Sequence, residues 1–356
     1  MWPTNPLTER LGIDVPIIQA PMAGASTPEL SAAVSNAGGL GSLGLGTSTL
    51  DIVDNQLSEH HKISNRALNA NFFCHEEPGD VSNSAKEMRS HLQPWFDEKG
   101  LGPVPPPSVP YGTFGDGHVD LIRRHRPKVV SFHFGLPAQD QLDTVRDSGA
   151  VILSSATTVA EARWLEQRGV DAIIAQGTEA GGHRGTFQGA DITMQPGLFA
   201  LLPQVCAAVS IPVIAAGGVV DGRTIAAAMM LGAHAVQIGT AFLRCPEAGI
   251  HAAHRAALAQ ASDDGSRLTR LFTGKPARSL RNRLLDDHAG AEADAAPYPS
   301  QLSLIAPLRR AASEENVSDV LALWSGQSAA LTREMPAAQL VRVLAEETGQ
   351  HLKSFA

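Results

Sequence analysis

The chain has 356 residues and a formal net charge of −8, with 43% hydrophobic and 18% charged residues. This composition provides a sizeable buried core and excludes global disorder. The acidic balance without a basic block argues against nucleic acid or a membrane as partner. No run reaches the roughly 18 consecutive apolar residues of a membrane span, so a cytoplasmic protein is expected. The wide spacing of the three cysteines excludes a disulfide framework and a zinc site; they are Cys74, Cys206 and Cys245.

Short β-rich runs alternate with helical patterns along the chain, which is typical of βαβ units and a parallel sheet. The length allows two ordinary domains or one large barrel with an appendage, and eight strands favour the barrel. The expected strands are Ile17–Ala20, Gly39–Leu43, Ala67–Phe73, Lys128–Phe134, Ala150–Ser154, Asp171–Gln176, Pro212–Ala216 and Ala235–Ile238. The fold class is therefore α/β, a (β/α)8 TIM barrel, with its active site at the carboxyl ends of the strands.

Two features near the N-terminus concern a cofactor. Ala20-Pro21-Met22-Ala23-Gly24 forms a tight loop after the first strand, and Met22 offers a polarizable surface suited to a flavin ring. Asn71, at the end of the third strand, is either a hydrogen-bonding residue of the site or a turn former. Gly39–Gly44 matches the spacing GxGxxG, but it forms a strand itself, so we do not expect dinucleotide binding there.

The expected domain organisation is a barrel over residues 1–270, with an insertion at about 78–127, followed by a mostly helical C-terminal segment over 271–356 that packs on the barrel. The insertion contains an acidic amphipathic helix and the proline-rich stretch Gly102–Pro110. A long polar loop, Gly177–Gly197, follows the sixth strand. Loops of this length without regular structure are usually functional.

Two histidines are candidates for the chemistry. His133 ends the fourth strand, where alternation places it on the same face as Ser131; it is either a ligand-facing residue or a buried histidine bonded to a carbonyl. His183 lies between glycines in Gln176–Gly185. Glycines provide no packing for a core histidine, so His183 is better explained as a side chain aimed into a cavity, although an exposed loop histidine is the alternative. Histidine transfers protons near neutral pH and donates to anions.

Glycines follow the seventh and eighth strands, in Ala215–Val219 and Gln237–Ala241. Glycines allow a phosphate to approach the backbone, and helix N-termini offer free N–H groups to it. Thr240 adds a hydroxyl donor. Ordinary turn glycines would explain either segment alone, but the pair on adjacent strands predicts a phosphate site.

These stretches resemble the nitronate monooxygenases, formerly called 2-nitropropane dioxygenases, in their class I form. The similarity covers nearly the whole chain in the expected order, and the histidine loop is its most specific part. The matching stretches are Pro16–Gly24, Asn71–His75, Ser131–Pro137, Gln176–Gly185, Ala215–Val219, Gln237–Phe242 and Phe272–Arg283.

The resemblance implies non-covalently bound FMN and oxidation of alkyl nitronates, with propionate 3-nitronate as the usual substrate. O2 is the co-substrate, a flavin semiquinone the intermediate, and a carbonyl compound and nitrite the products. His183 matches the catalytic histidine and His133 a second polar residue near the substrate. With the loops described above, the expected cofactor-binding residues are Ala20, Pro21, Met22, Gly24, Asn71, Gln176, Gly181, Gly182, Gly217, Gly218, Gln237, Ile238, Gly239 and Thr240.

The C-terminal segment departs from the family pattern, which leads us to expect tyrosine and lysine side chains from it in the pocket. Pro297–Arg309 offers Tyr298 as its only tyrosine and no lysine, and Tyr111 in the insertion is a possible substitute. Both tyrosines are candidate substrate-binding residues. The departure leaves the identity of the substrate more open than the fold or the cofactor.

Three other functions compete with this one. An NAD(P)H-dependent quinone or enoyl-thioester reductase of the same barrel superfamily would keep the FMN glycines, but the chain has no dedicated nicotinamide motif. A non-catalytic flavin-binding protein would not need His183. A metal enzyme is disfavoured because His60-His61 and the pair His251 and His254 lie on expected helices away from the site. A monomer or a homodimer is expected.

Overall fold

The computed structural model describes residues 5–81, 85–189 and 191–354. Its main sheet has eight parallel strands in the order β1-β9-β8-β6-β5-β4-β3-β2. A bridge between Ile18 and Leu40 joins the two edge strands and closes the barrel. All eight expected strands and the (β/α)8 fold class are confirmed. The strands are β1 (Ile17–Gln19), β2 (Gly41–Gly44), β3 (Leu68–Phe73), β4 (Val129–His133), β5 (Val151–Ala156), β6 (Ala172–Gln176), β8 (Val213–Ala216) and β9 (Ala235–Ile238).

Helices surround the barrel, and their sequences explain where they begin. The Thr27 side chain accepts a hydrogen bond from the backbone N–H of Leu30, and Asp221 does the same for Thr224, as expected of helix N-caps. No helix of the described ranges is long and apolar enough to cross a membrane. The outer helices are α2 (Pro28–Asn36), α3 (Leu50–Ile63), α5 (Asp116–His125), α6 (Gln139–Asp147), α7 (Val159–Gln167), α8 (Leu198–Ala208), α9 (Gly222–Met230) and α14 (Ala337–Ser354).

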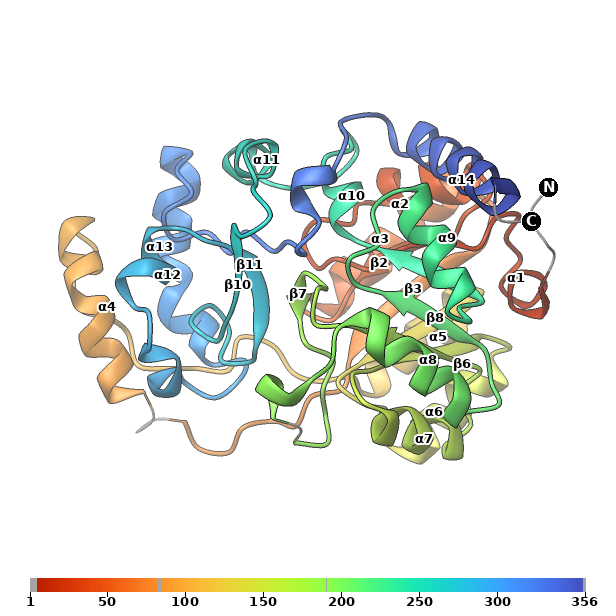
Figure 1. The fold of residues 1–356 in the computed structure, drawn as a ribbon. Helices are drawn as coiled ribbons and strands as arrows, with labels where there is room; N and C mark the ends of the chain where they lie inside the picture. Colours follow the sequence, from red (N-terminus) through yellow and green to blue (C-terminus); the bar gives the residue numbers. More distant parts are fainter. Residues whose placement is uncertain (1–4, 82–84, 190, 355–356) are drawn as a thin grey trace.

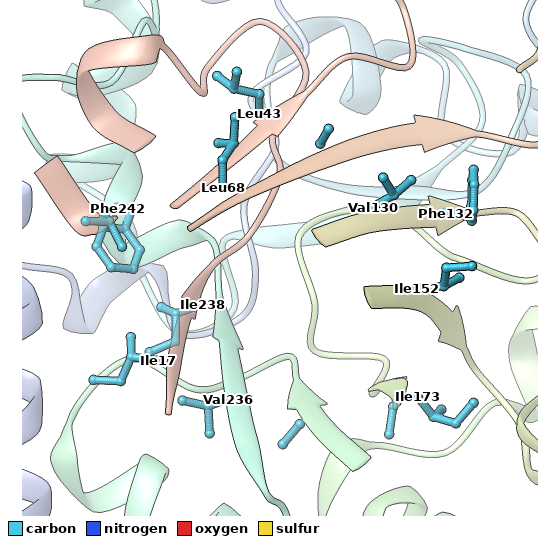
Figure 2. Packing of buried hydrophobic residues seen from close by; sticks show 14 of the residues in the cluster. Ile17, Leu43, Leu68, Val130, Phe132, Ile152, Ile173, Val236, Ile238 and Phe242 are labelled. Carbon is cyan, nitrogen blue, oxygen red and sulfur yellow. The ribbon is translucent and has the colours of Figure 1, made fainter. Parts of the chain in front are cut away.

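The main hydrophobic core lies between the outward-facing strand residues and these helices. Figure 2 shows such side chains on successive strands, among them Val130 and Phe132 on β4 and Ile152 on β5. A second set of apolar residues fills the barrel near the starts of its strands, where Leu7 and Leu11 of α1 (Pro6–Leu11) close it. Apolar packing at one end and around the outside leaves the carboxyl ends of the strands for polar groups.

The glycines of the GxGxxG stretch have a packing role. A Cβ atom on Gly41 would overlap the backbone of Ser31 in α2, and one on Gly44 would lie 2.6 Å from the backbone nitrogen of Ala23. The stretch ends in β2, as expected from the sequence, and the glycines allow close approach of the neighbouring backbone.

A separate hydrophobic cluster joins α4 (Lys86–Glu98) to elements from the last third of the chain. We call this group the second lobe. It comprises α4, α11 (Ala252–Ala259), β10 (Ser266–Thr269), β11 (Ala277–Leu280), α12 (Arg283–Asp287) and α13 (Gln301–Glu315). In Figure 1 it lies to the left of the barrel, although α4 is far from the other members in the sequence. Between the second lobe and α14, the short helix η3 (Ala329–Leu331) leads back to the barrel.

The second lobe contains an antiparallel sheet that the sequence did not predict. The hairpin β10–β11 pairs with β7 (Gly182–His183), a two-residue strand inside the long polar loop after β6. The same loop contains the short helix η1 (Ile192–Met194). The expectation of a loop without regular structure was therefore wrong in part, because β7 is too short to have a sequence pattern and exists only through its partner.

The last helix of the chain returns to the barrel. Leu340, Val341 and Leu344 of α14 are buried in the main core, and α14 packs against α9 and α2; Figure 1 shows the three helices side by side. At this contact, a Cβ atom on Gly222 would lie 2.6 Å from the backbone nitrogen of Thr348.

We expect Gly222→Ala to destabilise the protein by roughly 1–3 kcal/mol, the usual cost of overpacking a tight contact. Gly349→Ala is the matched control, because a Cβ there meets nothing within 4 Å and the residue lies inside α14. In a helix interior this exchange should stabilise by up to about 1 kcal/mol. Urea unfolding of the two variants measures both effects, and equal stability of the two would contradict the contact.

Candidate active site

A cavity of about 400 Å³ opens at the carboxyl ends of the barrel strands. The barrel contributes the residues that follow its strands, and the second lobe contributes a further wall. Of the residues predicted from sequence, the cavity is lined by Ala20, Pro21, Met22, Gly24, Asn71, Tyr111, His133, Gln176, Gly181, Gly182, His183, Gly217, Gly218, Gln237, Gly239 and Thr240. Two predicted residues are not part of its lining. Ile238 is buried in the main core, and Tyr298 is hydrogen-bonded to the lining residue Tyr111.

The glycine loops after β8 and β9 form one side of this cavity. Gly217 and Gly218 have positive φ angles of 110° and 71°, which residues with a Cβ rarely adopt. The segment Gly326–Ser328 lies against both loops: the N–H of Gly326 donates to Thr240 Oγ1 (2.9 Å), and the Ser328 hydroxyl donates to the carbonyl of Gly218 (2.8 Å). This segment was not predicted, because nothing in its own sequence indicates a ligand.

Two amide side chains offer acceptors toward a ligand. The Gln237 Oε1 atom is buried and has no hydrogen-bond donor in the part of the chain that the structure describes. Asn71 donates through Nδ2 to the carbonyl and hydroxyl of Ser131 (3.2 and 2.9 Å), an assignment based on the hydrogen-bond network. A buried acceptor without a donor costs free energy. A bound N–H or O–H group would supply the hydrogen bond that Gln237 Oε1 lacks.

His183 is held by the contact between barrel and second lobe. It is opposite Ala277 in the β7–β11 pairing, so a strand of the second lobe fixes its backbone. Its carbonyl accepts from Gln176 Nε2 (3.0 Å), and its Nε2 atom lies 2.9 Å from Thr273 Oγ1. The loop that carries His183 is therefore tightly constrained at this residue.

The two candidate histidines are in direct contact. His133 Nε2–H donates to the backbone carbonyl of His183 (3.2 Å), and the Ser155 hydroxyl donates to His133 Nδ1 (3.0 Å). This arrangement satisfies both ring nitrogens of a neutral His133. The prediction of a cavity-facing side chain and the alternative of a carbonyl-bonded histidine are both met, because His133 lines the cavity and also bonds a carbonyl.

Burial keeps both imidazoles neutral. It lowers the pKa of His183 to about 3, with smaller contributions from His133 and Lys275. It lowers the pKa of His133 to about 4, partly opposed by the bond to the His183 carbonyl. At neutral pH both rings are therefore uncharged hydrogen-bonding groups, until an anion nearby raises their pKa.

The rest of the His183 loop is fixed by buried polar groups. Arg184 is fully buried and donates to the carbonyl of Gln176 (2.8 Å) and to Gln195 Oε1 (2.9 Å). Glu161, also fully buried, accepts from the Thr186 hydroxyl (3.0 Å) and the N–H of Phe187 (2.8 Å). Charge-assisted bonds of this kind are stronger than neutral ones, so the loop is a rigid support for His183.

Both predicted tyrosines belong to an aromatic cluster beside His183. The two hydroxyl groups of Tyr111 and Tyr298 are 3.0 Å apart. The Tyr298 ring centroid is 5.6 Å from that of His183 and 4.9 Å from that of His75. Tyr298 therefore contacts the cavity through its neighbours, and Tyr111 lines it directly.

Several residues of the site were not assigned from the sequence. Thr273 and Lys275 lie in the stretch Phe272–Arg283 that was recognised as family-like, and this was a signal that could have identified them. Lys275 Nζ is 4.6 Å from the centroid of the Phe134 ring, so a lysine reaches the site although Pro297–Arg309 contains none. Arg309 also lines the cavity, and it ends the stretch Pro297–Arg309 that was inspected for pocket residues, whereas Trp324 lines the cavity without any local sequence signal.

Comparison with known proteins identifies the family. A model of the family described as nitronate monooxygenase matches residues 4–347. The chain belongs to the nitronate monooxygenase family. It is 43% identical to the nitronate monooxygenase of Pseudomonas aeruginosa over 349 residues, which cover 97% of this chain and 99% of that protein. It is therefore an enzyme, a flavin-dependent oxidoreductase of this family.

Solved structures agree with this assignment. The nitroalkane oxidase from Streptomyces ansochromogenes is similar with a TM-score of 0.90 and 39% identity, covering 98% of this chain and 100% of that one. FabK from Thermotoga maritima is similar with a TM-score of 0.75 and 28% identity, covering 98% and 97% of the two chains.

The buried histidines predict sensitivity to acid. Burial lowers the pKa values of His60, His75, His133 and His254 to about 4 and that of His183 to about 3. The unfolded state binds protons near pH 6.5, so the folded protein should lose stability as the pH falls from 6.5 to 4 and gain none above it. The loss at pH 5 should be on the order of 1–2 kcal/mol for each fully buried ring.

Urea unfolding at pH 7 and pH 5 measures this loss. His75→Phe is the informative variant, because both ring nitrogens of His75 lack a partner within the described residues and its neighbours are aromatic. The variant should lose less stability between the two pH values than the wild type. An identical pH dependence in both proteins would show that His75 is not held neutral.

Proposed function

We propose that this enzyme is an FMN-dependent monooxygenase that oxidises alkyl nitronates with O2 to a carbonyl compound and nitrite, with propionate 3-nitronate as substrate. The supporting observation is the position of two neutral imidazoles, His183 and His133, in the same cavity as the glycine loops after β8 and β9. Family membership supports the same reaction class.

The residues present fit FMN. Gly217, Gly218, Gly239 and Thr240 offer backbone N–H groups and a hydroxyl for a phosphate, and the unpartnered Gln237 Oε1 offers an acceptor for a flavin N–H or ribityl hydroxyl. The loops after β9 and β1 lie side by side, because a Cβ on Gly239 would lie 3.5 Å from the Cβ of Ala20 and 3.7 Å from the sulfur of Met22. A bound FMN supplies the redox chemistry, and the protein supplies binding and orientation.

The low pKa of His183 is consistent with a substrate that arrives as an anion. A base that titrates near pH 3 is poorly matched to removing a carbon-bound proton from a neutral nitroalkane at pH 7. A nitronate has already lost that proton. His183 then only needs to hold the anion, which it does as a hydrogen-bond donor.

Thr273 controls which ring nitrogen of His183 donates. When the Thr273 hydroxyl donates to the carbonyl of Lys275 (3.3 Å), it accepts from His183 Nε2–H. When it donates to Nε2 instead, the proton is on Nδ1, which becomes a donor for an anion. Thr273 is therefore a positioning residue for His183.

Turnover of propionate 3-nitronate tests the proposed function. The purified enzyme with FMN should consume O2 and release nitrite, and the substrate should change the flavin spectrum in the absence of air. His183→Asn should lower kcat/KM roughly ten- to hundredfold, the effect of losing a hydrogen bond to a charged group. Retained flavin with no nitrite release from any nitronate would contradict the proposal.

The similarity to FabK supports a second candidate, an NAD(P)H-dependent FMN quinone or enoyl-thioester reductase of the same barrel superfamily. The two functions share the glycine loops and differ in the electron donor. Rapid bleaching of the flavin by NADH or NADPH without air, with no reaction toward nitronates, would decide for the reductase.

Thr273→Val should lower kcat/KM for the nitronate about three- to tenfold, since it removes one neutral hydrogen bond and leaves the shape similar. Thr273→Ser keeps the hydroxyl and should restore most of the activity. The pH profile of kcat/KM separates orientation from packing, because the valine variant should also shift the pH at which His183 titrates. Equal losses in both variants with an unchanged pH profile would show that Thr273 only packs.

A further inference from the structure

Arg309 is a cation in the wall that the second lobe adds to the cavity. It lies on α13, seven residues after Leu302, so the two side chains share a helix face, and both line the cavity. Leu302 and two further lining residues, Ile250 and Ala322, pack against the hydrophobic cluster of the second lobe. A guanidinium thus stands among apolar groups in a ligand cavity.

Among the described residues, no carboxylate pairs with this guanidinium. Arg309 forms no ion pair within the described residues, and its Nε atom is buried without a hydrogen-bond partner. Burial lowers the pKa of Arg309, and the neighbouring Tyr111 phenol partly opposes this effect. Other arginines of this acidic chain are paired, for example Arg283 with Glu98 and Arg267 with Glu292.

Burying a positive charge without a partner costs free energy unless an anion pairs with it. Arginine stays protonated at neutral pH even when burial disfavours the charge. Arg309 lines the cavity, so an anionic ligand bound in this cavity can pair with it.

The proposed function brings two anions into the cavity, the FMN phosphate and the substrate. The position of Arg309 indicates which of the two it binds. Its neighbour Tyr111 belongs to the segment after β3, because the nearby Thr113 hydroxyl donates to the carbonyl of Phe73 (3.2 Å). In the barrel, three strands separate β3 from β8, whose glycine loop forms the candidate phosphate site. Through Tyr298, the Tyr111 hydroxyl is linked to the His183 side of the cavity.

We propose that Arg309 binds the carboxylate at the far end of the substrate, and that this one side chain determines the preference for a carboxylate-bearing nitronate over an uncharged alkyl nitronate. This inference rests on the proposed function, and it assigns the substrate specificity of that function to Arg309. The guanidinium binds the carboxylate in a bidentate manner with the Tyr111 hydroxyl beside it, and the methylene groups lie along Leu302, Ile250 and Ala322.

The test compares substrates with and without the carboxylate in matched variants. Propionate 3-nitronate and propyl 1-nitronate have the same chain length, and the nitronate of 4-nitrobutanoate adds one methylene. For Arg309→Met, the ratio of kcat/KM for propionate 3-nitronate to that for propyl 1-nitronate should fall roughly ten- to hundredfold. Arg309→Lys keeps the charge but loses the bidentate geometry, so its ratio should lie between those of the wild type and the methionine variant.

Arg310→Met is the control, because it removes the same charge from the next residue of α13, which is exposed. The ratio should be the same in this variant as in the wild type. A ratio that falls equally in Arg309→Met and Arg310→Met would show a general effect of net charge and overturn the proposal.

A binding measurement decides the role of Arg309 without turnover. Glutarate, titrated into the FMN-loaded enzyme and followed by the flavin absorbance, should bind the wild type at least tenfold more tightly than Arg309→Met. If no nitronate is oxidised, the proposed function fails, and this titration still tests Arg309. Equal glutarate affinity in both proteins would overturn the carboxylate assignment even if nitronates are oxidised. If Arg309→Met does not fold, Arg309→Lys gives the same comparison with the charge retained.

Discussion

The pairing of β7 with β11 is the interaction on which the candidate site depends. β7 has only two residues, Gly182 and His183, and it exists because β11 of the second lobe supplies its hydrogen-bond partners. The barrel provides the loop, and the second lobe provides the conformation in which His183 is held beside His133 and Thr273. The histidine therefore connects two separately packed hydrophobic clusters, so neither part forms the site without the other.

Positively charged side chains lie at the cavity, although the protein as a whole is acidic. The chain has a net charge of −8, yet Lys275 acts electrostatically on the two neutral histidines and Arg309 lines the cavity. The one carboxylate of the lining, Glu179, accepts from the backbone N–H of Leu198 (2.8 and 2.9 Å). A cavity with cations and neutral imidazoles around it favours anions, and it does so most strongly where water is excluded. This polarity is what a negatively charged substrate requires.

The barrel could be predicted from the sequence because each βα unit has its own local pattern. All eight strands, the loops after β1, β8 and β9, and the cavity position of His183 and His133 follow from residues that are close together in the chain. The second lobe could not be predicted in this way. β10 and β11 are four residues each with no clear alternation, and Trp324 and Ser328 reach the cavity from a segment that is distant in sequence from the strand-end loops. Their roles come from tertiary packing, which one sequence does not display.

The path of the chain also has a consequence for synthesis on the ribosome. The second lobe is built mostly from residues between β9 and α14, so the helix that covers α2 and α9 is made only after that lobe. The surface of α2 that packs against α14 therefore remains uncovered until α14 has emerged. During this interval, it is a natural target for a chaperone, because transiently exposed apolar surface promotes aggregation. The last helix therefore packs on the barrel only after all eight strands and the second lobe have been made.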